Sequence, residues 1–239
     1  MNLRTLTKVA LLRAGSRSSE KTIHYLNALF DYAELGWWLR SHEFSGGFRL
    51  SSCLDMPGVI AADVGVRPVL YIQFGAEDED MAPRWAHALR HPETRLHVFD
   101  AAEDRQGQWL PARGRGHWWE SQRSTRSAPA DEKARLEALD PRGEYFSGAL
   151  PDLFAGYEWP EAEIVVAVFD TDHYGTTKAA LDFIGPRLPT QAYLFFDQLN
   201  HRADELRAFH EFLEESGRSF DLFAGNRELS CIAFRARQV

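Results

Sequence analysis

Four residues that could bind ligands or take part in catalysis each directly follow an apolar run typical of a buried β-strand: Gly75, Asp100, Asp170 and Asp197. The carboxyl ends of parallel strands meet at one edge of a sheet, and ligands bind beyond that edge. We therefore expect these residues, which are far apart along the chain, to line one cavity. Carboxylates in a partly desolvated cleft lower stability unless a cationic group compensates them, so their recurrence at strand ends favours a functional role.

The acids after two of these runs suggest metal chemistry. Asp170, Asp172 and Asp197 could converge, and oxygen ligands of this kind suit Mg²⁺ or another octahedral cation. Such a metal lowers the pKa of a bound hydroxyl, and Asp172 or His173 could then accept the proton as the catalytic base. The alternative is structural: Asp172 caps a helix that begins near Gly175, and His173 is an ordinary surface histidine.

Asp100 has a different expected role. An acid at the end of a second strand commonly accepts hydrogen bonds from the ribose hydroxyls of a nucleoside cofactor. A helix cap or turn is the alternative for Asp100. The following segment, residues 101–130, lacks periodicity and is rich in Gly, Arg, Ser and Trp, so it either grips an anionic or flat substrate or is a solvated loop.

The elements that must position these residues alternate along the chain. Strands are expected at 69–74, 95–99, near 145–146, at 164–169 and at 192–196, and helices at 77–89, 176–184 and 203–215. Two further strands, 220–223 and 229–234, are joined by a connection too short for a parallel crossover, so they must form an antiparallel hairpin. The pattern predicts a doubly wound, mostly parallel α/β sheet that ends in this hairpin.

The N-terminal part of the chain reads differently. Residues 19–44 have helical spacing of apolar side chains, and Ser19 can cap the helix. We expect residues 1–66 to form a helical extension and residues 67–239 to form the sheet domain. One possibility is that the extension covers the sheet or a neighbouring subunit, and contact with a subunit would make the protein a homo-oligomer. The other is that it acts as a lid over the substrate.

Composition excludes several classes of protein. The 239 residues include 27 Lys and Arg against 35 Asp and Glu, a net charge of −8, which argues against nucleic acid as the main partner. No apolar run could cross a bilayer, and the start of the chain lacks a signal-peptide core, so no membrane partner and a cytoplasmic location are expected. Cys53 and Cys231 are far apart in sequence, so both are expected to be small buried apolar residues.

Several segments resemble one enzyme family. The segments Val168–Thr177 (Val-Phe-Asp-Thr-Asp-His-Tyr-Gly-Thr-Thr) and Phe195–Asn200 (Phe-Phe-Asp-Gln-Leu-Asn) resemble the TylF-like macrocin O-methyltransferases, as do Leu150–Phe154, Pro92–Asp100 and Pro186-Arg-Leu. The similarity covers about residues 69–235. It implies a seven-stranded, Rossmann-like class I methyltransferase that uses S-adenosylmethionine and Mg²⁺ to methylate a hydroxyl of a small metabolite, such as a sugar in natural product biosynthesis.

The resemblance also implies roles for individual residues. Asp170 and Asp197 fall on metal-ligand positions, and Asp172 falls on the position of the general base. We expect the cofactor contacts to come from the strand ends, at Gln73, Gly75, Asp100, Phe146 and Ser147.

Three positions depart from the family pattern. Gln198 stands where a second metal-binding acid is common; its amide oxygen can still coordinate a metal but brings no charge. Glu79 stands where relatives have a second glycine, and Gln73 where they have an acid. These departures favour an alternative, a methyltransferase-like protein whose methyl transfer is lost or altered and which serves as a binding or partner protein.

Overall fold

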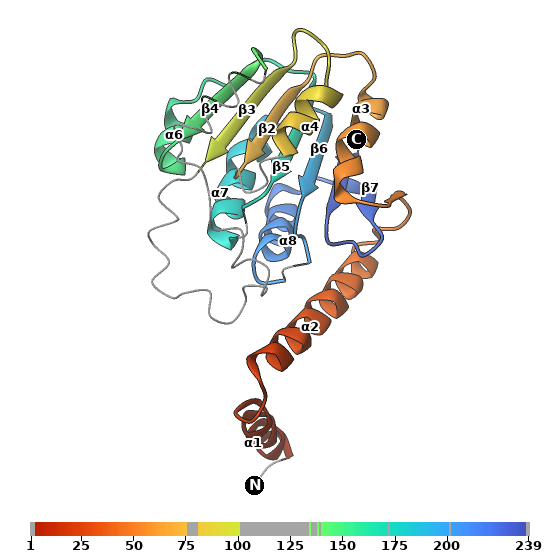
Figure 1. The fold of residues 1–239 in the computed structure, drawn as a ribbon, viewed down its shortest axis with the longest axis vertical. Helices are drawn as coiled ribbons and strands as arrows, with labels where there is room; N and C mark the ends of the chain where they lie inside the picture. Colours follow the sequence, from red (N-terminus) through yellow and green to blue (C-terminus); the bar gives the residue numbers. More distant parts are fainter. Residues whose placement is uncertain are drawn as a thin grey trace.

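The fold is that of a computed structural model, which describes residues 3–75, 81–100, 134, 138, 140–171, 173–200 and 202–237. Within these ranges one mixed sheet lies between two layers of helices, and a pair of N-terminal helices projects away from it (Figure 1). The predictions that fall on residues 76–80, on residues 101–130 and on Asp172 lie outside the described residues.

The described strands form a single eight-stranded sheet in the order β1-β7-β8-β6-β5-β2-β3-β4. Their bounds are β1 Phe48–Leu50, β2 Leu70–Phe74, β3 Arg95–Asp100, β4 Gly143–Ser147, β5 Ile164–Phe169, β6 Gln191–Phe196, β7 Phe220–Asn226 and β8 Ile232–Ala236. All pairings are parallel except those of β8, which runs antiparallel to both β6 and β7. The predicted mostly parallel α/β sheet with a C-terminal antiparallel hairpin is confirmed.

The helices cover both faces of the sheet. They are α1 Leu3–Gly15, α2 Glu20–Ser41, α3 Met56–Val64, α4 Met81–Ala88, α6 Leu150–Gly156, α7 Tyr174–Ile184 and α8 Glu205–Ser216, with short 3-10 turns η1 Cys53–Asp55 and η3 Gly185–Arg187. In Figure 1, α3 and α4 lie on one side of the strands, with α7 and α8 on the other.

The central strands explain why two helical layers form. Every residue of β5 is buried, and alternate side chains point into two separate cores: Val165 and Phe169 into the core under α7 and α8, Val166 and Val168 into the core under α3 and α4. A parallel sheet buried on both faces has such unbroken apolar strands, whereas a half-exposed sheet alternates polar and apolar residues.

The strand count differs from the prediction of seven. The additional strand is β1, three residues long, which pairs in parallel with β7 at the sheet edge. Leu50 of β1 and Met56, Ile60 and Val64 of α3 are buried in the core under α4. The segment predicted as an N-terminal extension, residues 1–66, therefore includes elements of the sheet and its core, and only α1 and the first part of α2 project from them.

The helix predicted at 19–44 is α2, and Ser19 caps it as expected, because its side chain accepts a hydrogen bond from the Thr22 amide at 3.2 Å. Only the C-terminal part of α2 packs on the sheet domain, through Leu35, Trp38 and Leu39. This part of α2 covers the sheet, whereas a role for the rest of the helix as a subunit contact or a lid stays a prediction.

The two cysteines form a disulfide in the structure, which corrects the expectation of two separate apolar residues. Cys53 lies in η1 and Cys231 directly precedes β8; their Cα atoms are 5.9 Å apart although 178 residues separate them in sequence. The pairing of β1 with β7 brings these segments together, and sequence spacing does not reveal such a tertiary contact. Among the described helices, none is long and apolar enough to span a membrane.

Candidate functional site

The residues predicted at the strand ends lie along one edge of the sheet. Backbone hydrogen bonds continue the ladder past the last paired residues: the Gly75 N–H donates to the Phe99 carbonyl at 2.8 Å, and the Asp170 N–H to the Phe74 carbonyl at 2.9 Å. The Asp197 N–H donates to the Phe169 carbonyl at 3.1 Å. Gly75, Asp100, Asp170 and Asp197 therefore occupy successive positions along one rim, which we call the strand-end rim.

Gly75 is required by the geometry of this rim. Its φ is +86°, a conformation that residues with a Cβ rarely adopt, and an added Cβ would lie 1.8 Å from the Asp170 carbonyl oxygen. Glycine thus lets the end of β2 approach the end of β5 closely.

Gln73, predicted to contact a cofactor, is buried, and its side chain forms hydrogen bonds with Tyr71 and Gly75. Its Oε1 accepts a hydrogen bond from the Tyr71 hydroxyl at 2.6 Å, and its Nε2 donates to the Gly75 carbonyl at 2.9 Å. The side chain therefore supports the turn at Gly75, and its contact with a cofactor stays a prediction.

Asp100 lies at the end of β3 and is buried. The hydroxyl of Tyr145, on the neighbouring β4, donates a hydrogen bond to its Oδ2 at 2.6 Å, which holds the carboxylate at the rim. Phe146 and Ser147 end β4 beside it: the ring of Phe146 stacks on Phe99 with 4.7 Å between centroids, while Ser147 is exposed. The structure thus brings three of the predicted cofactor residues to adjoining strand ends.

The predicted metal ligands follow two neighbouring strands at the rim, because β5 and β6 are paired in parallel. Asp170 is 3% exposed, and Asp197 and Gln198 are partly buried. Within the described part of the chain, no group of three or more His, Cys, Asp or Glu side chains is arranged to hold a metal ion. The magnesium site at Asp170, Asp197 and Gln198 that the resemblance implies stays a prediction.

His173, the second candidate base, is the N-cap residue of α7 and is partly buried. Its carbonyl accepts hydrogen bonds from the Thr177 amide at 3.0 Å and from the Thr177 hydroxyl at 2.9 Å, which fixes the backbone where the chain leaves β5. The helix begins at Tyr174, one residue before the predicted start at Gly175.

Glu205 is a rim residue that the sequence reading missed. It is the first residue of α8, only 1% exposed, and its Oε2 accepts a hydrogen bond from the Gln198 N–H at 3.2 Å. Burial raises the pKa of its carboxyl well above the ordinary value, and the negative charges of Asp197 and Asp170 raise it further. The sequence signal that could have identified Glu205 is its position on the apolar side of the predicted helix, next to the buried Leu206.

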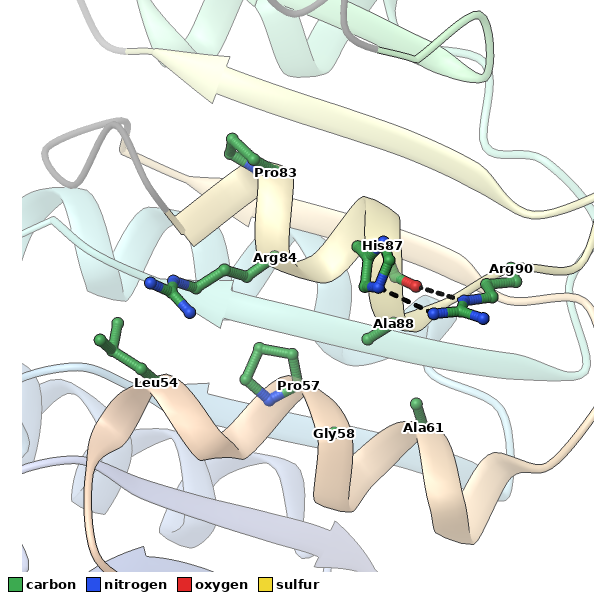
Figure 2. A pocket seen from close by; sticks show the side chains of 9 residues that line it. All are labelled: Leu54, Pro57, Gly58, Ala61, Pro83, Arg84, His87, Ala88 and Arg90. Atoms are coloured by element: carbon green, nitrogen blue, oxygen red, sulfur yellow. Dashed lines mark hydrogen bonds between the residues drawn. The ribbon is translucent and has the colours of Figure 1, made fainter.

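A separate groove lies on the outer surface between α3 and α4, with a cavity volume of about 520 Å³ (Figure 2). Leu54, Pro57 and Ala61 form one wall, and Arg84 and His87 face them from α4. None of the predicted site residues lines this groove. The candidate site is therefore the strand-end rim.

Comparisons with known proteins agree with this arrangement at the level of the fold. No protein-family model and no curated protein sequence matches the chain. Among solved structures, apo CalS11, a TDP-rhamnose 3'-O-methyltransferase of calicheamicin biosynthesis, is 22% identical, with 76% of each chain covered and a TM-score of 0.50. An O-methyltransferase from Bacillus cereus, solved in complex with S-adenosylhomocysteine, is 9% identical, with 92% of this chain and 100% of that chain covered and a TM-score of 0.52.

Similarity at such low sequence identity establishes the fold. The chain has the fold of the class I methyltransferases, a mostly parallel α/β sheet with a C-terminal antiparallel hairpin.

Proposed function

We propose that this protein is an S-adenosylmethionine-dependent methyltransferase that acts on a hydroxyl group of a small metabolite, such as a sugar or another natural product. The observation that carries the proposal is the strand-end rim, where Gly75, Asp100 and Asp170 lie on adjacent parallel strands at the end where ligands bind in such sheets. Two solved proteins of the same fold are described as O-methyltransferases, one of them complexed with S-adenosylhomocysteine.

Different residues of the rim would bind the cofactor and accept the proton of the substrate hydroxyl. Asp100, held by Tyr145 at the end of β3, would accept hydrogen bonds from the ribose hydroxyls of the cofactor. His173, just beyond β5, is the described candidate for accepting the proton of the substrate hydroxyl; Asp172 is the other predicted base. When bound, S-adenosylmethionine would supply an electrophilic methyl group. The requirement for Mg²⁺ implied by the resemblance remains a separate prediction.

Calorimetry with S-adenosylmethionine tests the proposal directly. We expect saturable binding by the purified chain, and methyl transfer to a hydroxylated acceptor when a panel of sugars and phenols is screened with and without Mg²⁺. Absence of binding at millimolar S-adenosylmethionine would overturn the proposal.

A second candidate, a methyltransferase-like binding or partner protein without methyl transfer, is favoured by Gln198 at a position where an acid is common in the resembled family. The variant Glu79→Gly separates the two candidates. A gain of tenfold or more in affinity for S-adenosylmethionine would indicate that Glu79 weakens cofactor binding in the native chain, whereas tight binding by the native chain with little change in the variant would favour the enzyme.

The partner of the projecting helices is proposed to be a second copy of this chain. The side chains of α1 and of the first part of α2 include large apolar residues that are exposed: Leu6, Leu11, Leu12, Tyr25, Leu26, Leu29 and Phe30. An exposed apolar surface of this kind marks an interaction site. Residues 1–18 carry four basic and no acidic side chains, and because the whole chain carries −8, residues 19–239 carry −12. A basic, apolar helix thus complements the acidic body of another copy.

A further inference from the structure

Glu205 is an ionisable residue in a position where stability alone would disfavour it. An acid at the start of a helix normally lies at the surface, where it interacts with the helix dipole in contact with water. Glu205 is instead almost fully buried, and its Oε1 has no hydrogen-bond partner among the described residues. Burial of a carboxyl group with an unsatisfied oxygen beside Asp170 and Asp197 lowers stability.

The contacts of Glu205 join two chain segments that leave the sheet side by side. β5 and β6 are paired in parallel, and Phe169 lies opposite Phe196 at their ends. The next residues are Asp170 and Asp197, which makes them neighbours across the rim.

The carboxyl group of Glu205 interacts with the backbone immediately after both aspartates. The N–H of Gln198, which follows Asp197, donates to Oε2 at 3.2 Å. The backbone N–H of Thr171, which follows Asp170, also forms a hydrogen bond with the carboxyl group of Glu205. One side chain from α8 therefore acts on the direction in which both segments leave the sheet.

We propose that Glu205 is a positioning residue that holds the chain after β5 and after β6, so that Asp170 and Asp197 keep fixed directions at the strand-end rim. Its effect on ligand binding rests on the proposed function of this rim; its effect on the backbone does not. Fixed carboxylates bind a ligand without first losing conformational freedom, so the role of Glu205 is to preorganise the site.

Two substitutions of Glu205 distinguish an effect of its backbone hydrogen bonds from an effect of its ionisable group. Glu205→Gln keeps an oxygen that accepts hydrogen bonds from the backbone but cannot ionise, whereas Glu205→Ala removes both the oxygen and the ionisable group. Glu214 on the same helix is the matched control, because its side chain is 68% exposed and contacts only the His210 ring, at 3.7 Å, among the described ion pairs. The measurements are amide hydrogen exchange at Thr171 and Gln198, and calorimetric affinity for S-adenosylhomocysteine.

We expect the Glu205→Ala variant to exchange the Gln198 amide at least tenfold faster and to bind S-adenosylhomocysteine at least tenfold more weakly, with exchange in β5 and β6 unchanged. Glu205→Gln should restore both values to within about threefold of the native protein, and Glu214→Ala should change neither. If Glu205→Ala does not fold, Glu205→Asp, whose carboxyl is one methylene shorter, should show the same losses.

Equal losses in the Gln and Ala variants would overturn the proposal, because charge rather than hydrogen bonding would then matter. Unchanged exchange in Glu205→Ala would overturn it as well. If the native chain binds no S-adenosylhomocysteine, the proposed function fails, and the exchange data alone decide whether Glu205 holds the two segments.

Discussion

At the scale of single residues, the rim depends on a position with no room for a side chain. Gly75 combines a left-handed backbone conformation with close approach to the carbonyl of Asp170. Gln73 reinforces the same turn through its hydrogen bond to the Gly75 carbonyl. The end of β2 is therefore shaped by backbone geometry and by a buried amide.

Substitution of this glycine should destabilise the protein. We expect Gly75→Ala to lower the free energy of unfolding by roughly 2 kcal/mol or more, because the new Cβ strains the backbone and overlaps the Asp170 carbonyl. Gly58, in α3, is the matched control, since a Cβ added there meets nothing within 4 Å. Gly58→Ala should be neutral or stabilising by up to about 1 kcal/mol. Urea denaturation of both variants measures the difference; equal stabilities would contradict the assigned role of Gly75.

The strand-end residues could be predicted because their position follows from topology alone: whatever follows a parallel strand lies at the same edge of the sheet. What surrounds each side chain could not be predicted in this way. The Tyr145 hydroxyl on Asp100 depends on the order of β3 and β4 in the sheet, and the contact of Glu205 with Gln198 depends on how α8 packs.

At the scale of elements, the strands that are buried on both faces could be predicted from the sequence, and the short exposed strand could not. The entirely apolar sequence of β5 indicates a central strand, because a strand that is covered on both faces has this composition. β1 is three residues long with two of them exposed, so it carries no periodicity. Its place in the sheet comes from its contact with β7. The disulfide of Cys53 with Cys231 was missed for the same reason.

This disulfide should contribute substantially to stability. A cross-link between residues 178 positions apart restricts the unfolded chain, and its loss typically lowers the free energy of unfolding by roughly 2–5 kcal/mol. We expect dithiothreitol to shift the urea midpoint of the native protein downward. The double variant Cys53→Ser, Cys231→Ser should have the lower urea midpoint both with and without dithiothreitol. A native midpoint that reductant leaves unchanged would argue against the cross-link.

At the scale of the whole molecule, the chain divides into a sheet domain and two helices that project from it (Figure 1). The C-terminal part of α2 is anchored by Arg202, whose side chain lies 3.0 Å from Asp31 and 3.4 Å from Glu34. Before these contacts, most of the large apolar side chains of α1 and α2 are exposed. The projecting helices are therefore the natural place for contact with a second copy.

Full-length variants test this association. We expect the native chain to sediment as a dimer, and the double variant Leu29→Asp, Phe30→Asp to sediment as a monomer, because both side chains are more than half exposed and charges there oppose apolar contact. Val66→Asp is the control, since Val66 is 90% exposed but lies outside α1 and α2. A native monomer at tens of micromolar would contradict the proposed pairing.

The bond between Cys53 and Cys231 closes a covalent ring that contains β2 to β7 and the helices between them. A protease that cuts once anywhere inside this ring leaves both fragments attached, so the nicked protein keeps its mass until the sulfurs are reduced. Fragments that belong to one sheet would stay at high effective concentration and could re-form their strand pairs after unfolding. The ring thereby protects the sheet against the consequences of a single cleavage.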